Sequence, residues 1–217
     1  MGNKLSTLYK KVDSCKFCKK LGNKLQHIYG YGTQSPETML VLINPTYRNL
    51  SSHPDYIGPR FPFIGVRQFW NVLGDGGLIA KLQLPLRADW KPEHTKLLQT
   101  ELEKNKLFLT NIVKCCYEHS AYPEKEVIAD QLKLLAEEIR IVKPKRIIAF
   151  GTLVHKTLTG ETIKLRDYLT STQKSFEIVS GLDVPVMPVY FPIGRGNPKK
   201  AAEILRKYET ALHRSAH

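Results

Sequence analysis

The chain has 217 residues, of which 42% are hydrophobic and 24% are charged, as in ordinary soluble proteins that bury a sizeable core. No apolar stretch approaches the roughly 20 residues of a bilayer-spanning helix, and the N-terminus lacks the apolar segment of a signal peptide, so we expect no membrane partner and a cytoplasmic, nucleoid-associated or nuclear location. The formal net charge of +13 indicates a polyanionic partner, with nucleic acid the first expectation.

The lysine-rich N-terminal segment carries Cys15 and Cys18, and Cys115 and Cys116 follow much later. Because no secretory signal is seen, disulfides are not expected. The four cysteines are therefore interpreted as thiol ligands of a metal or as spare thiols.

Strand and helix patterns alternate along the chain. Short, continuous apolar runs are typical of strands buried on both faces, and they occupy residues 38–43, 107–113, 145–151 and 184–191. Helical patterns occupy residues 86–105, 124–142, 152–160 and 197–215, the last opening with Asn197 as N-cap and a proline in the first turn. This order predicts one domain of residues 1–217, a three-layer α/β/α sandwich around a parallel sheet of about four strands. We expect a monomer.

Ligands bind beyond the carboxyl ends of the strands in open parallel sheets, so the loops after residues 43, 113 and 191 are the candidates for a site. Asn44 ends the first strand and precedes a proline. It caps a following helix or orients a water in a dry cleft. Phe63, in the same loop, is a core residue or a stacking platform for a base.

Asn111 lies inside an apolar strand, where an amide is costly unless its hydrogen bonds are met. Its donor and acceptor match a pyrimidine edge that carries a carbonyl next to an N–H. The alternative is that Asn111 bonds to neighbouring backbone. The third loop holds Arg195 between two glycines, and such a basic loop suits close approach to a duplex backbone.

In the order of the chain, six segments resemble the uracil-DNA glycosylase superfamily, and specifically its iron–sulfur group, family four. They are CKFC, IYGYGTQSPETMLVLINP, GPRFPFIG, LTNIVKC, IVKPKRIIAFGTLVHKTLTG and PVYFP, and they extend over most of the chain. Each match alone is weak, but six in the right order are specific.

The resemblance implies a role for each candidate residue. Asn44 would orient the attacking water, Phe63 would stack on the flipped base, and Asn111 would read its Watson–Crick edge. Ile43 and Phe191 would complete the base pocket, and residues 193–197 would enter the minor groove. The DNA-binding residues would be Arg195, Gly196, Asn197 and Lys199.

Three departures from family four are visible. Ile43 replaces the glutamate of the first motif, so that Ile43-Asn44-Pro45 is closer to the Gly-x-Asn-Pro motif of mismatch-specific and single-strand-selective glycosylases. Phe191 replaces the histidine of the second motif, which could stabilise negative charge on the departing base. The fourth cluster cysteine is expected near Asp130 or Gln131, and neither is cysteine.

The metal site therefore has several candidate forms. A [4Fe–4S] cluster normally takes four thiolates, so Cys116, His119 or Asp130 would have to join Cys15, Cys18 and Cys115. Adjacent cysteines reach two corners of one cluster poorly, which leaves a zinc site or no metal as alternatives.

The sequence thus predicts a DNA repair glycosylase that removes uracil, or a related deaminated base, from DNA by hydrolysis of the N-glycosidic bond. The alternative is a non-catalytic nucleic-acid-binding protein on the same fold. A nucleotide-binding α/β enzyme is disfavoured because no glycine-rich phosphate loop is found.

Overall fold

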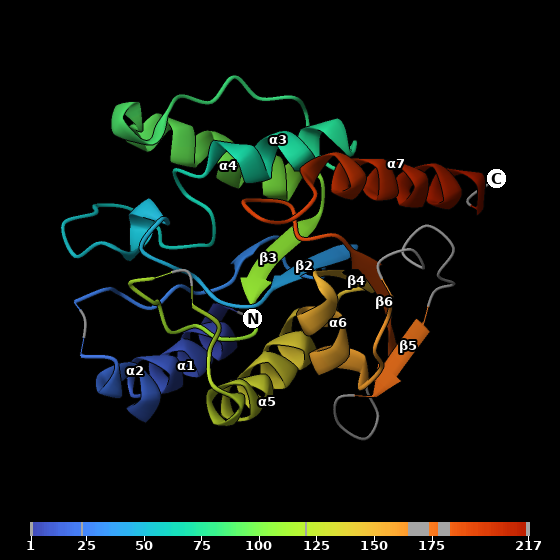
Figure 1. The fold of residues 1–217 in the computed structure, drawn as a ribbon. Coiled ribbons are helices and arrows are strands. Elements are labelled where there is room, and N and C mark those ends of the chain that lie inside the picture. Colours follow the sequence, from blue (N-terminus) through green and yellow to red (C-terminus); the bar gives the residue numbers. More distant parts are fainter. Residues whose placement is uncertain (1, 23, 120, 165–173, 178–182, 216–217) are drawn as a thin grey trace.

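The computed structural model describes residues 2–22, 24–119, 121–164, 174–177 and 183–215. In this part of the chain the strands form one six-stranded sheet in the order β1-β3-β2-β4-β6-β5, with helices on both faces (Figure 1). The bounds are β1 Tyr31–Gly32, β2 Thr38–Leu42, β3 Leu107–Asn111, β4 Arg146–Phe150, β5 Lys174–Glu177 and β6 Asp183–Val189.

The central strands β3, β2, β4 and β6 are parallel, while β1 and β5 pair antiparallel at the two edges. The predicted α/β sandwich with a parallel sheet is confirmed, and the antiparallel edge strands add to the four strands expected. Every residue of β2 and β3 is buried, as the continuous apolar runs predict for strands covered on both faces.

Two hydrophobic cores fill the spaces between the sheet and its helices. The first lies beneath α3 (Arg67–Asp75), α4 (Pro92–Lys104) and α7 (Pro198–Ser215), the upper layer of Figure 1. The second lies beneath α1 (Gly2–Asp13), α5 (Lys125–Val142) and α6 (Thr152–Thr159), with the short α2 (Lys16–Lys20) beside them. Short 3-10 helices η1 (Leu50–Ser52) and η2 (Arg87–Asp89) lie in the loops.

The predicted N-cap of the last helix is confirmed. Asn197 Oδ1 accepts a hydrogen bond from the Lys200 N–H at 3.0 Å, so that Asn197 caps α7 ahead of the proline. Gly160 ends α6 in the left-handed conformation, with φ of 73°. None of the helices in the described ranges combines the length and the apolar character that a bilayer span requires.

The carboxyl ends of the parallel strands lie at one edge of the sheet. Leu42 is paired with Asn111 in the register of β2 and β3, and Phe150 is paired with Val189 in that of β4 and β6. Side chains alternate between the faces, so Leu40, Leu42, Leu107 and Leu109 join the first core, whereas Met39, Val41 and Phe108 join the second.

Candidate functional site

The loops that follow β2 and β3 run side by side beyond the sheet. The Ile112 and Val113 N–H groups continue the ladder to the carbonyls of Leu42 and Ile43, each at 2.8 Å. Further on, Thr46 and Tyr117 form an isolated parallel bridge. The residues just after the two strands are therefore held in a fixed relation to each other, with Asn44 between them.

The loop after β6 reaches the same region from the other half of the sheet. Its turn is closed by hydrogen bonds from Gly196 N–H to the Ile193 carbonyl and from Asn197 N–H to the Phe191 carbonyl, both 2.9 Å. A Cβ at Gly196 would collide with the Phe191 carbonyl, so this position requires glycine. Gly194 N–H also donates to Gln68 Oε1 of α3 at 3.4 Å.

Asn111 carries a buried amide that lacks partners. Its residue is 1% exposed, and neither Nδ2 nor Oδ1 makes a hydrogen bond. By strand alternation its side chain faces the first core, as do Leu107 and Leu109. The alternative that Asn111 bonds neighbouring backbone is not seen. Two unpaired buried polar atoms cost about 1–3 kcal/mol each, and they leave one donor and one acceptor on this amide with which a ligand could pair.

Asn44 is partly exposed, and its amide is anchored through nitrogen. Nδ2 donates to the Pro45 carbonyl at 3.1 Å and to the Ala121 carbonyl at 3.4 Å. The helix that follows is η1, and its N-cap is Asn49, whose side chain accepts from the Ser51 N–H. Asn44 is therefore not a helix cap, and the fixed Nδ2 leaves Oδ1 as an oriented acceptor.

Phe63 is held in an unusual backbone conformation, with φ of 66°. Its carbonyl accepts a hydrogen bond from Trp70 Nε1 at 2.9 Å, and its ring stacks on Phe69 with centroids 4.1 Å apart. A left-handed bulky residue costs of order 1–3 kcal/mol and persists only where its surroundings enforce it, as Trp70 and Phe69 do here. Phe63 packs on the first core, the core that Asn111 faces.

The remaining predicted residues divide between the two sides of the sheet. Phe191 is partly buried and packs against the first core, on the side of Asn111 and Phe63. The side chain of Ile43 is buried in the second core, so the structure does not bring it to the other pocket residues. Arg195 and Lys199 are exposed, and Asn197 Oδ1 is engaged as the cap of α7.

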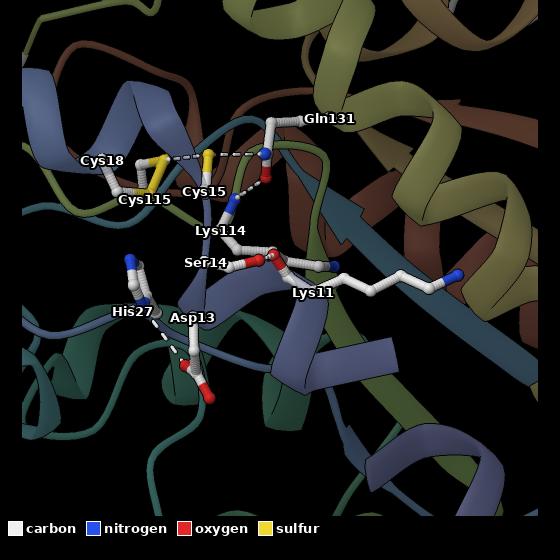
Figure 2. The surroundings of a disulfide bond; sticks show 9 residues. All are labelled: Lys11, Asp13, Ser14, Cys15, Cys18, His27, Lys114, Cys115 and Gln131. Atoms are coloured by element: carbon white, nitrogen blue, oxygen red, sulfur yellow. Dashed lines mark hydrogen bonds and ion pairs between the residues drawn. A yellow bond between two sulfur atoms is a disulfide. The ribbon is translucent and has the colours of Figure 1, made fainter. Parts of the chain in front are cut away.

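Three of the four cysteines meet between α2 and the loop after β3 (Figure 2). Cys18 and Cys115 form a disulfide, and Cys15 Sγ lies 3.8 Å from Cys115 Sγ. The expectation that no cysteine would be bridged is therefore corrected, because the fold brings these two residues, distant in the chain, to adjoining positions.

Cys116 lies outside this group. Its thiol is buried and hydrogen-bonded with the Ser52 side chain, and burial raises its pKa to about 11. Neither His119 nor Asp130 joins the three sulfurs in the part of the chain that the structure describes. The side chains present thus fit a site of three thiols, once the disulfide is reduced, and not a site of four.

Gln131 fills the place beside Cys15. Its Nε2 lies 3.2 Å from Cys15 Sγ, and its Oε1 accepts from the Lys114 N–H at 3.2 Å (Figure 2). The residue is completely buried. An amide engaged at both ends thus stands near the position at which the resemblance predicts a fourth cysteine.

A family model described as the Uracil DNA glycosylase superfamily matches residues 29–212. This chain belongs to the uracil DNA glycosylase superfamily. It is also similar to a type-4 uracil-DNA glycosylase from Pyrobaculum aerophilum, with 37% identity over 57 residues. That match covers 26% of this chain and 29% of the relative, so the chain spans less than a third of the length of this curated relative.

Two buried charges of this superfamily member escaped the sequence analysis. Lys114, just after the strand that ends at Asn111, forms an ion pair with Glu138 of α5, with Nζ 2.7 Å from Oε2. Burial lowers the pKa of Lys114, and the nearby carboxylate opposes that shift. The signal in the sequence was a lysine placed directly between the apolar run 107–113 and Cys115, since lysine is almost never fully buried without a partner.

Proposed function

We propose that this chain is a DNA glycosylase that hydrolyses the N-glycosidic bond of uracil, or a related deaminated base, in DNA. The observation that carries the proposal is the buried amide of Asn111, whose donor and acceptor have no partner. Membership of the uracil DNA glycosylase superfamily supports the same reaction class. The partial match to the type-4 enzyme supports uracil as the base.

Base recognition begins with extrusion, because the sugar carbon of a stacked nucleotide is out of reach. A uracil in the pocket offers an N3–H donor next to the O4 acceptor. Asn111 Oδ1 accepts from N3–H and Nδ2 donates to O4, which satisfies both unpaired atoms together. Phe63 stacks on the face of the base, opposite the side on which its own ring contacts Phe69.

Asn44 orients the attacking water. With Nδ2 bound to the carbonyls of Pro45 and Ala121, Oδ1 accepts a hydrogen bond from one O–H of the water, which directs a lone pair of the water oxygen at the glycosidic carbon. Such a preorganised polar group needs no reorganisation as charge develops in the transition state. The bond breaks toward an oxocarbenium-like sugar and a uracil anion. The water oxygen then bonds to the sugar carbon and loses one proton, which neutralises the uracil anion, so that the products are the abasic sugar and free uracil.

The leaving base must carry negative charge without help from residue 191. Phe191 offers no hydrogen bond where family four is expected to place histidine. Asn111 Nδ2, directed at O4, is the donor that the pocket supplies to the anion. The rate is therefore expected to be lower than that of a pocket with the additional donor.

DNA is held through phosphates by the exposed basic residues Arg195 and Lys199, within a chain of net charge +13. The loop 193–197, held against α3 through Gln68, enters the minor groove and fills the gap left by the extruded base. The DNA phosphates also stabilise the positive sugar of the transition state.

A metal centre, if loaded, would be held by Cys15, Cys18 and Cys115, and it would require the Cys18–Cys115 bond to be reduced. Three thiolates fall one short of the four of a usual [4Fe–4S] cluster, whereas zinc accepts three cysteines and one further ligand. Its place beneath the loop after β3 supports a structural role, tying the N-terminal helices to that loop. The residues that read the base and orient the water are not among its ligands.

The test is an abasic-site assay. Single-stranded and duplex oligonucleotides that carry uracil, hypoxanthine, xanthine or mispaired thymine are incubated with the protein and then cleaved at abasic sites by alkali. Product from uracil substrates, together with release of free uracil, is the expected result. Salt-sensitive binding without any product would instead establish the alternative, a non-catalytic nucleic-acid binder.

A further inference from the structure

A fully buried ion pair lies directly behind Asn111. The side chains of Lys114 and Glu138 are 1% and 0% exposed. All three N–H bonds of the ammonium are used: one to the Asn111 carbonyl at 2.6 Å, one to Glu138 Oε2 at 2.7 Å and one to Thr110 Oγ1. The ammonium thus joins the last two residues of β3 to α5.

The carboxylate of Glu138 is also fully satisfied. Besides Lys114, it accepts hydrogen bonds from Thr110 Oγ1 and from the Tyr9 hydroxyl of α1, both at 2.8 Å. Because side chains alternate along β3, Thr110 faces α5 while Asn111 faces the first core, on the side where the base is proposed to bind. The hydrogen bonds of Lys114 and Glu138 therefore hold β3 from the face opposite to the side chain of Asn111.

The amide of Asn111 needs such support. It makes no hydrogen bond of its own, so none fixes its rotation before a base arrives. Its direction depends on the backbone of residues 110 and 111 and on packing. A buried ion pair is poor evidence for stability, because well-packed apolar residues often replace one without loss.

We propose that Lys114, held by Glu138, is a positioning residue for base recognition: it fixes the end of β3 so that the unpaired Asn111 amide points into the pocket. The proposal rests on the proposed function for the identity of the base. It goes beyond it by assigning a role to two residues that touch neither base nor water.

The test removes both charges together, because Lys114→Met alone would leave Glu138 buried and unpaired. Lys114→Met/Glu138→Gln keeps an oxygen that can accept from Tyr9 and Thr110. The matched control is Arg146→Met/Glu209→Gln, which removes another ion pair (2.8 Å) at the start of β4, the opposite edge of the sheet. Single-turnover excision of uracil should fall about 10- to 100-fold in the first variant and stay at the parent rate in the control.

A cycle with Asn111→Ala separates positioning from general destabilisation. If Lys114 acts through Asn111, adding the Lys114→Met/Glu138→Gln changes to Asn111→Ala should cost almost nothing further. Two outcomes would overturn the proposal while leaving uracil excision established. In one, the rate losses of Asn111→Ala and Lys114→Met/Glu138→Gln multiply when the changes are combined. In the other, Lys114→Met/Glu138→Gln excises uracil at the same rate as the Arg146→Met/Glu209→Gln control.

A second readout is independent of activity. The side-chain amide resonances of Asn111, assigned by their loss in Asn111→Ala, are followed in 15N-labelled protein. They should shift or broaden in the Lys114→Met/Glu138→Gln variant and remain unchanged in the Arg146→Met/Glu209→Gln control. Unchanged resonances in both would refute positioning even in a protein that binds DNA without cleaving it.

Discussion

The ring of Phe63 stacks on the ring of Phe69 with an angle of 17° between their planes. One face of Phe63 is thereby covered, and its backbone is fixed in the left-handed region. Phe63→Leu, which keeps the bulk and loses the aromatic face, should weaken uracil excision by about 1–3 kcal/mol of stacking. Phe63→Tyr should retain most of the activity. A leucine variant with the parent kcat/KM would show that Phe63 only packs.

Replacement of the base-reading amide gives the second prediction. Asn111→Asp should slow uracil excision, because a carboxylate cannot donate to O4, at a cost of about 1–3 kcal/mol in discrimination. Gln34→Glu makes the same chemical change at an exposed position before β2, at the opposite edge of the sheet, and should have no effect. The measurement is the excision rate on uracil-containing duplexes. If Asn111→Asp excises uracil at the parent rate, Asn111 does not recognise the base.

Asn44→Ala should separate chemistry from binding. Loss of an oriented acceptor is expected to slow single-turnover cleavage by about 100-fold or more, with little change in affinity for uracil-containing DNA. Fluorescence anisotropy measures the affinity and rapid-quench sampling measures the rate. A defect confined to binding contradicts the water-orienting role.

The basic loop gives the fourth prediction. Arg195→Ala should reduce activity on duplex substrates more than on single strands, since only a duplex leaves a gap to fill. Arg140→Ala removes the same charge from an exposed position on α5 and serves as the control. Equal losses on both substrates, with a salt slope smaller by about one, would instead indicate a simple phosphate contact.

The cysteines give the fifth prediction. Protein oxidised in air should show two free thiols in denaturant, those of Cys15 and Cys116. Cys18→Ser should lower its free energy of unfolding by about 2–4 kcal/mol, because the bond closes a long loop. The measurement is denaturant unfolding with and without reductant, and an unchanged midpoint would argue against a stabilising bond.

Anaerobic, reducing purification tests the metal separately. Three thiols should hold one zinc ion per chain, and this loading should be lost in Cys15→Ser and retained in Cys116→Ser. Stoichiometric iron with absorbance near 400 nm (a range implied by the family-four resemblance) would establish a cluster instead. If the protein purified under these conditions contains no metal, Cys15, Cys18 and Cys115 are ordinary thiols and not metal ligands.

The positions of the four parallel strands along the chain and their polar ends could be predicted from the sequence, because each depends on a local pattern. Which face of the sheet each strand side chain occupies could not be predicted in this way. Ile43 was grouped with Asn111, yet it shares its parity along β2 with Met39 and Val41 and so enters the second core. That outcome follows from the register of Leu42 with Asn111, which no single segment contains.

Contacts between residues distant in the sequence could not be predicted for the same reason. The hydrogen bond from Gln131 to Cys15 and the ion pair of Lys114 with Glu138 each join two separate segments of the chain. The short edge strand β1, with two residues, is below the length at which periodicity is informative. Likewise α3 is brief and has glycine near its end, so its helical signal is weak.

The strand order has a consequence for synthesis of the chain. β2 lies between β3 and β4 in the sheet, yet it precedes both in the sequence. While the ribosome extends the chain, this strand, apolar except for Thr38, emerges with neither neighbour available, and both of its hydrogen-bonding edges are open. Such a segment is a template for misassociation between nascent chains. Productive folding must therefore await the arrival of β3 and β4, and slowing translation between residues 42 and 107 should lower the yield of native protein.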